Sequence, residues 1–369
     1  DTILLDSLAE ANHGASAYVR PGENIEESVS AFYNKVQAPV LADLQLDFGG
    51  VMVSDVYPAP LPDLFAGSQL VVVGRYRDGD NVTIALSGTV NGEKRVFEYG
   101  DQRFRESGGD DFIPRLWATR KIGYLLNQIR LHGEKEEWVK AIVDLSVRYG
   151  IVTPYTSYLI TEDDILTTEG RDRVTQDETL RLQAAPPEAS GGGAVTASQD
   201  QSAMAGAETV QQPGDEYANV VKNAGIRTFV NVDGVWTDTQ FDPSKMTTTK
   251  VQFASDDYFA LAAARPELGA AFALGARVIV VSEGVAYEVM NDNAPPLVIP
   301  PTNTPEPTSV IPASTLEPNA TPFVTDIPPD LLPDAGQPPS FSNGLAVAGT
   351  VVVLLAAGMM VVMLRRQRN

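Results

Sequence analysis

Few side chains in this sequence could carry acid–base or nucleophilic chemistry. Histidine is the side chain best suited to act as a base near neutral pH, and the sequence has two, His13 and His132, each next to a glycine at the end of an expected helix. That position is typical of a capping or surface role. The sequence has no cysteine and lacks the G-x-S-x-G, phosphate-loop and H-E-x-x-H patterns. We therefore predict no catalytic residue, no cofactor and no enzyme activity.

Acidic side chains are the candidates for a cation site. Glu162, Asp163 and Asp164 follow one another and offer the carboxylate oxygens that Ca²⁺ prefers. Runs of acidic residues are more often solvated surface than metal sites. We predict no metal-binding residue in this chain, and this acidic triplet is the first place to look if a cation binds.

A short motif near the C-terminus could direct covalent processing. The segment Leu332-Pro333-Asp334-Ala335-Gly336 resembles the L-P-x-T-G signal of sortase substrates, with Ala335 in place of the usual threonine. It precedes an apolar run and an arginine-rich tail, in the order such signals have. Two hypotheses stay open: processing by a sortase, or a plain membrane anchor in which the motif has no role.

The apolar run extends from Gly344 to Leu364, and Thr350 is its one polar side chain. As a helix rising about 1.5 Å per residue it would span about 30 Å, the thickness of a bilayer's hydrocarbon core. Basic residues follow it, so the positive-inside rule places the C-terminus in the cytoplasm and the body outside. These anchor residues are Arg365, Arg366 and Arg368. The sequence thus predicts a single-pass cell-membrane protein with the lipid bilayer as a partner.

Charge and cysteine content restrict the class of protein. The formal net charge of -21 would repel phosphate backbones, so nucleic acid is not an expected partner. A body outside the cell without any cysteine favours a prokaryotic surface protein, because eukaryotic ectodomains of this size usually carry disulfides. The chain begins at Asp1 with no leader for export, so we expect further N-terminal domains.

Hydrophobic periodicity predicts the folded elements. Helical spacing marks residues 3–12 and 25–36, on either side of a strand-like stretch at 15–19. From 40 to 99 the alternation has a period of two, with turn residues between runs, which predicts an antiparallel sheet forming one face of a sandwich. Two amphipathic helices follow, and Trp138 lies on the apolar stripe of the second, where we expect it to be buried.

Composition predicts the domain boundaries of an α+β multidomain chain. Its parts are the end of an α/β domain (1–36), a β-rich, sandwich-like domain with a helix pair (37–182), a flexible linker (183–215), a small α+β domain (216–291), a Pro/Thr-rich stalk (292–343), a transmembrane helix (344–364) and a cytoplasmic basic tail (365–369).

Several short pieces of the first half occur in an informative order. They are Phe32-Tyr33, Ala38-Pro39-Val40-Leu41-Ala42-Asp43, Leu64-Phe65-Ala66-Gly67-Ser68-Gln69, Arg115-Leu116-Trp117-Ala118, and the run from Leu145 to Ser157. Together, over roughly residues 1–160, they resemble inter-alpha-trypsin inhibitor heavy chains and their bacterial relatives. Those proteins carry a von Willebrand factor A domain after a so-called VIT domain. The resemblance implies that 1–36 is the C-terminal remnant of an A domain, followed by the β-rich region.

The resemblance also bears on function. The family binds ligands at a metal-ion-dependent adhesion site with a D-x-S-x-S loop, but here Ser28-Val29-Ser30 follows Glu26-Glu27 and lacks the aspartate, so no metal ligand is implied. The leading hypothesis is a membrane-anchored surface protein for binding or adhesion, whose extracellular protein ligand binds through N-terminal domains outside this sequence. The alternatives are a structural spacer that presents an N-terminal head, a sortase-processed cell-wall protein, and an enzyme or protease inhibitor with its site in residues 228–290.

Overall fold

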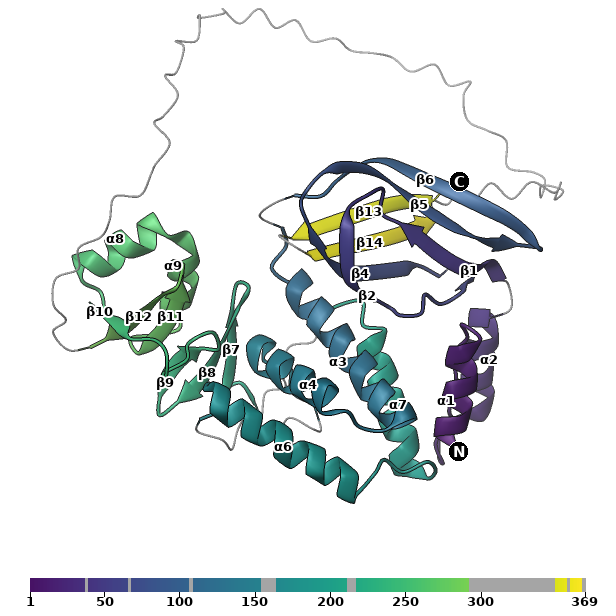
Figure 1. Cartoon of the computed structure of the whole chain (residues 1–369), viewed down its shortest axis with the longest axis horizontal. Helices are drawn as coiled ribbons and strands as arrows, with labels where there is room; N and C mark the ends of the chain where they lie inside the picture. Colours follow the sequence, from purple (N-terminus) through teal and green to yellow (C-terminus); the bar gives the residue numbers. More distant parts are fainter. Residues whose placement is uncertain are drawn as a thin grey trace, which may run out of the picture. The chain divides into compact units, whose positions relative to one another are not determined.

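The structure is a computed structural model of the 369-residue chain (Figure 1). It describes residues 1–36, 39–65, 68–105, 109–153, 164–210, 217–291, 349–356 and 359–366. Several predicted features lie outside these residues: the stalk at 292–343, the motif Leu332 to Gly336, Gly344, Arg368, Glu162 and Asp163.

Two antiparallel sheets form the β-rich region and share one apolar core. The first has the order β3-β1-β5-β6, with β1 at Pro39–Asp47, β3 at Leu64–Phe65, β5 at Asn81–Val90 and β6 at Glu93–Arg103. The second has the order β13-β14-β4-β2, with β2 at Met52–Tyr57, β4 at Leu70–Arg77, β13 at Gly349–Ala356 and β14 at Met359–Arg366. Asn91 and Gly92 join β5 to β6 with positive φ angles of 51° and 82°, the tight hairpin that this dipeptide favours.

Strand β4 is buried on both faces. Because side chains alternate along a strand, Leu70 and Val72 enter the core between the two sheets, while Val71 and Val73 pack with the buried residues of helix α3 (Ile113–His132). The β4 sheet therefore lies between the other sheet and a layer of helices. A near-continuous apolar sequence is what such a doubly covered strand requires.

The helical layer contains α3 (Ile113–His132), α4 (Glu136–Tyr149), α6 (Thr168–Ala184) and α7 (Gly192–Ala205). Trp117 in α3 is buried, and its indole nitrogen donates to the carbonyl of Asp55 at 2.9 Å. Trp138 in α4 is only partly buried, with the Lys135 ammonium 4.1 Å from its ring centre, and the neighbouring Val139 takes the buried position. The prediction that Trp138 is buried is corrected to a partly buried position that packs against the core.

Helix α7 falls in the segment 183–215, which the composition predicts to be a flexible linker. Gly123 in α3 faces the end of α7, and a Cβ placed on it would lie 2.7 Å from the Cβ of Met204. The small residues that make this segment poor in apolar surface are the ones that let two helix backbones approach closely. The amino-acid composition of a segment shows how much apolar surface it has, but not which other helix it packs against.

The third sheet is mixed and has the order β10-β12-β11-β9-β8-β7. Its strands and two helices are β7 (Val221–Ala224), β8 (Arg227–Val232), β9 (Val235–Asp238), β10 (Thr248–Gln252), α8 (Asp256–Ala264), α9 (Pro266–Phe272), β11 (Val278–Ser282) and β12 (Val285–Met290). This sheet contacts the end of α4, where Gly150 adopts a φ of 61° and a Cβ would lie 2.6 Å from Val221 Cγ1. The Thr239 hydroxyl also donates to the Arg148 carbonyl at 3.0 Å.

The predicted transmembrane helix is wrong. The apolar C-terminal run forms two strands, β13 (Gly349–Ala356) and β14 (Met359–Arg366), which pair antiparallel, and β14 pairs with β4. Leu364, Arg365 and Arg366 thus lie in a strand. Each half of the run has the length of a strand and contains β-branched valines, so by sequence pattern a long apolar run fits strands as well as a helix.

In the part of the chain that the structure describes, no helix combines the length and apolar character needed to cross a membrane. The prediction of a single-pass protein of the cell membrane depended on such a helix and is corrected with it. The bilayer was proposed as a partner on the same ground and is not carried forward.

Candidate functional site

Helix α1 (Thr2–Ala11) buries polar side chains and exposes leucines. Thr2 and Asp6 are 3% and 7% exposed, whereas Leu4 and Leu8 are 57% and 55% exposed. Helical spacing in the sequence predicts the leucine side as the buried one. The observed orientation is the opposite, because the polar face of α1 meets polar groups of α3 and α7 in the interior.

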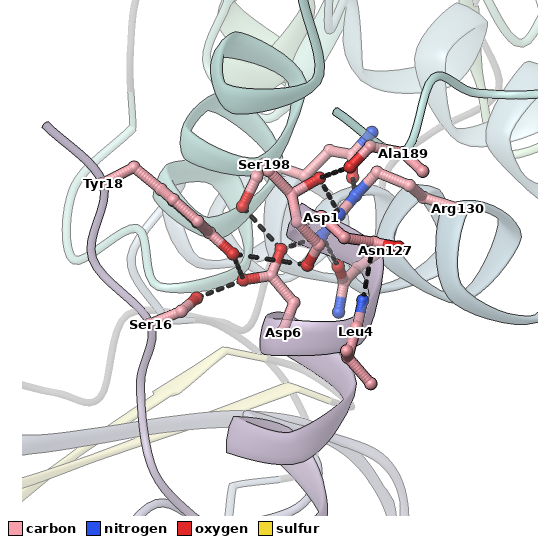
Figure 2. A network of polar contacts seen from close by, with 11 residues as sticks. Asp1, Leu4, Asp6, Ser16, Tyr18, Asn127, Arg130, Ala189 and Ser198 are labelled. Carbon is pink, nitrogen blue, oxygen red and sulfur yellow. Dashed lines mark hydrogen bonds and ion pairs between the residues drawn. The ribbon is translucent and has the colours of Figure 1, made fainter. Parts of the chain in front are cut away.

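The carboxylate of Asp6 is the centre of this interior network (Figure 2). The Arg130 guanidinium contacts Asp6 Oδ2 at 2.5 Å, and the Ser198 hydroxyl donates to the same oxygen at 2.6 Å. On the other side, Tyr18 donates to Oδ1 at 2.6 Å and the Ser16 hydroxyl also donates there. Donors from α3, α7 and the segment after α1 thus converge on one buried carboxylate.

Arg130 is held by further acceptors. Its Nε donates to Gln201 Oε1 at 2.8 Å, and its Nη2 donates to Asn127 Oδ1 at 2.8 Å. The start of α1 is fixed from another side, because the Thr2 amide donates to the Ala189 carbonyl at 2.7 Å. The guanidinium and the carboxylate are both buried and both satisfied, the condition under which a buried ion pair is tolerated.

The network changes the proton affinity of its members. Burial raises the pKa of Asp6, but hydrogen bonds from Ser16, Ser198, Tyr18 and Arg130 favour the charged form more strongly, so its pKa lies below the usual value. Burial and the hydrogen bond to Asp6 raise the pKa of Tyr18. Asp6 is therefore a charged structural group at neutral pH and is unsuited to act there as a general base.

Beside the network lies a cavity of about 340 Å³, bounded by α1, the loop after β2, α3 and the end of α7. Polar side chains from two helices line it. Asp6 and Glu10 come from α1 and His13 follows that helix, while Arg120, Tyr124 and Asn127 come from α3. Asp6 and Glu10 stand at i and i+4 of α1, and Arg120, Tyr124 and Asn127 at i, i+4 and i+7 of α3, the spacing that places side chains on one helix face.

The residues singled out in the sequence are scattered. His13 has a φ of 55°, lines the cavity and lies 3.8 Å from a carboxylate oxygen of Asp43, whereas His132 is exposed at the last position of α3. Asp164 is ion-paired with Arg173 at 2.5 Å. Within the described ranges, no group of three or more His, Cys, Asp or Glu side chains is arranged to hold a metal ion.

The sequence interpretation missed the buried polar residues altogether. Helix α3 has four buried polar side chains, Arg115, Arg120, Gln128 and Arg130, an uncommon number for one helix. A signal was available in the sequence, because these residues interrupt the apolar faces of an otherwise uniform helix. Nothing in the sequence indicated that Gln128 and Arg130 would find their partners, Glu10 and Asp6, on α1.

Comparison with known proteins shows similarity to inter-alpha-trypsin inhibitor heavy chains. The chain is 30% identical to heavy chain H3 of Mus musculus over 173 residues, which covers 44% of this chain and 20% of that protein. It is 28% identical to heavy chain H3 of Homo sapiens over 174 residues, covering 44% and 19%. For heavy chain H2 of Homo sapiens the identity is 27% over 173 residues, covering 43% and 18%.

This similarity confirms the resemblance predicted from the sequence, over less than half of the chain. The chain spans about a fifth of the length of the curated relatives it matches. No family model and no solved structure matches it. The relatives are named as heavy chains of an inhibitor, which is consistent with the prediction of a non-enzymatic protein.

Proposed function

We propose that this chain is part of a larger protein that binds another protein. Residues 1–36 would belong to an α/β domain of von Willebrand factor A type, and the rest of the chain would support that domain. The observation that carries the proposal is the exposed leucine face of α1. Sequence similarity to inter-alpha-trypsin inhibitor heavy chains also supports the proposal.

Two N-terminal helices expose apolar stripes. Leu4, Leu5 and Leu8 are exposed on α1, and Ile25, Val29 and Tyr33 are exposed on α2 (Ile25–Val36). Exposed apolar residues in such concentration mark an interface, because a helix lowers its free energy by covering its apolar stripe. The occupant we propose is the sheet of the same α/β domain, since helices of α/β domains cover the faces of a mostly parallel sheet.

The opposite face of α1 attaches this helix to the rest of the chain. The buried pair of Asp6 and Arg130 fixes α1 to α3, and Ser198 connects it to α7. A domain seated on the leucine face would therefore be held firmly on the helical layer. We propose that this arrangement presents the binding domain in a fixed orientation to its protein partner.

The test uses the chain extended by the residues encoded before Asp1. We expect that region to contain a D-x-S-x-S loop, to slow hydrogen exchange in residues 2–11 and 25–36, and to bind a protein partner only with Mg²⁺ present. A catalytic domain there, or exchange as fast as in the chain alone, contradicts the proposal.

Matched variants locate the interface. Leu4→Gln combined with Leu8→Gln should leave the chain alone unchanged in stability but lower the melting temperature of the extended protein. Leu180→Gln, at an exposed leucine of α6, should change neither. If the chain alone forms a dimer that the double variant abolishes, a second copy is the occupant and the proposal is wrong.

A further inference from the structure

The cavity beside α1 is lined by a buried cation that has no anionic partner. Arg120 of α3 lines this space of about 340 Å³ and is 3% exposed. In the part of the chain that the structure describes, it forms no ion pair. Burying a charge without an opposite charge beside it costs free energy, so a guanidinium at this place requires an explanation.

The guanidinium of Arg120 has one nitrogen left for a ligand. Its Nε donates to the Ala207 carbonyl at 2.6 Å, and its Nη1 donates to the carbonyls of Tyr57, at 3.4 Å, and Val71. Across the described ranges, its Nη2 has no hydrogen-bond partner. Protein atoms enclose Nε and Nη2 of Arg115, but they do not enclose this nitrogen. The carbonyls therefore hold the guanidinium in place, and Nη2 is the group that it offers to the cavity.

The nearest acidic side chains do not neutralise Arg120. Burial lowers the pKa of Arg120 to about 10, against the effect of the Glu208 charge. Glu208 is exposed and accepts a hydrogen bond from the Gln69 amide at 2.7 Å. Glu10 accepts from Gln128 at 2.9 Å, and Gln128 stands eight residues farther along α3, about 12 Å away at the rise of a helix. A negative charge beside Nη2 would therefore be favourable.

Two neutral donors follow Arg120 on the same face of α3. Tyr124 and Asn127 stand four and seven residues after it, and both line the cavity. Burial raises the pKa of Tyr124, so its phenol stays protonated and can donate. Asn127 accepts from Arg130 through Oδ1 at 2.8 Å, and its amide nitrogen has no acceptor among the described residues. A carboxylate on this face would meet one cationic and two neutral donors.

Aromatic rings and prolines form an apolar part of the lining. The rings of Tyr57 and Tyr124 lie 5.3 Å apart at 49°, and Pro58 and Pro60 follow Tyr57 along the cavity. The volume is at the low end of the range of about 300 to 1,000 Å³ that small-molecule pockets occupy. An occupant should therefore be small and should carry an apolar body next to its charged group.

From this arrangement we infer that the cavity binds a small monocarboxylate with an apolar body, an aromatic or branched short-chain acid, with its carboxylate at Nη2 of Arg120. One negative charge compensates the buried guanidinium. An anion of higher charge, such as phosphate, would be repelled by the carboxylates of Asp6 and Glu10, which line the same cavity. The inference is independent of the role proposed for the leucine face of α1.

The experiment is calorimetric titration of the full chain at neutral pH with benzoate, phenylacetate and 3-methylbutanoate. The matched carboxamides keep the apolar body and remove the charge, whereas acetate keeps the charge and removes the body. We expect at least one of the three acids to bind with a Kd below about 1 mM, and its carboxamide and acetate to bind at least tenfold more weakly. The inference is wrong if none of the three acids binds in this range. Equal binding of the carboxamide also overturns it, because the charge of Arg120 would then have no part in binding.

Inorganic phosphate distinguishes a carboxylate site from a general anion site. We expect phosphate to bind more weakly than the best of the three acids and to leave the Kd of that acid unchanged. Phosphate that binds as tightly as the acid, or displaces it, contradicts the inference.

A pair of tyrosine variants tests the position of the site. Tyr124→Phe keeps the ring beside Tyr57 and removes the hydroxyl donor, so it should weaken binding of the acid about threefold or more at an unchanged melting temperature. Tyr33→Phe, at an exposed tyrosine of α2, is the matched control and should bind normally. Replacing Arg120 would leave three carbonyls without their donor and could unfold the chain, so the carboxamides report on that end instead. Normal binding by Tyr124→Phe would mean that the acid binds elsewhere, and the inference would be wrong.

Discussion

Gly123 in α3 lies so close to the backbone nitrogen of Ala205 in α7 that no side chain fits between them. A methyl group at Gly123 would force the two helices apart. We expect Gly123→Ala to lower the free energy of unfolding by about 1 to 3 kcal/mol, the usual cost of overpacking. Gly269→Ala is the control, because nothing lies within 4 Å of a Cβ there and alanine favours the helix α9. Urea unfolding measures the stability of both variants. A Gly123→Ala variant as stable as the unmodified chain would disprove the close packing of α3 against α7.

Breaking the buried ion pair between Asp6 and Arg130 should lower the free energy of unfolding strongly. Asp6→Asn leaves the Arg130 guanidinium buried without its carboxylate, so we expect a loss of about 3 to 5 kcal/mol of unfolding free energy. Asp177→Asn removes an exposed carboxylate of the same helical layer and should be neutral. Denaturant unfolding measures both, and equal effects would show that Asp6 is solvated in solution.

The same carboxylate predicts a pH dependence. Since the folded-state pKa of Asp6 is lowered, its stabilising effect is complete above the unfolded value of about 3.9 and is lost as pH falls through the folded value. The difference in stability between the chain and Asp6→Asn should be constant at neutral pH and shrink in acid below about pH 4. Thermal unfolding across this range checks it, and a difference that grows in acid would contradict the sign.

The two tryptophans of the helix pair should differ. Trp117 is buried and hydrogen-bonded, so Trp117→Ala should cost about 3 to 5 kcal/mol. Trp138 is partly buried at the edge of the same core, so Trp138→Ala should cost clearly less. Chemical unfolding ranks the variants, and the reverse order would restore the sequence-based expectation for Trp138.

Titration with cations tests the prediction that this chain has no tight metal site. The acidic triplet is the candidate named from the sequence, and its one described member, Asp164, is engaged by Arg173. Hydrogen bonding to Arg173 lowers the pKa of Asp164. Calorimetry of the chain with Mg²⁺ and with Ca²⁺ should detect no micromolar site. If one appears, the ion pair with Arg173 must break to form it, and Arg173→Gln should then tighten cation binding.

Local patterns predicted local structure well. The alternation from 40 to 99 gave antiparallel strands, and Asn91-Gly92 gave their hairpin, because both signals act between neighbours in sequence. Helix α4 follows its apolar spacing, and α3 and α4 end at Gly133 and Gly150, because these signals also act between neighbours in sequence.

What depends on distant partners was not predictable. Asp6 and Arg130 are far apart in sequence, and the hydrophobic pattern of α1 favours the leucine face, which the structure leaves exposed. The run from 349 to 366 fits either a helix or paired valine-rich strands by periodicity alone. Its pairing with β4 decides between them, and pairing is not encoded within the run itself.

Because Ser16 and Ser198 both donate to the carboxylate of Asp6, substitutions at these positions should depend on one another in evolution. While Asp6 is present, losing Ser16 or Ser198 leaves a buried carboxylate oxygen short of a donor and is selected against. Once Asp6 is replaced, those hydroxyls lose their acceptor and drift freely, so the effects of substitutions in the group are not additive. Related sequences should therefore keep or lose these residues as a block, with Arg130 changing alongside them.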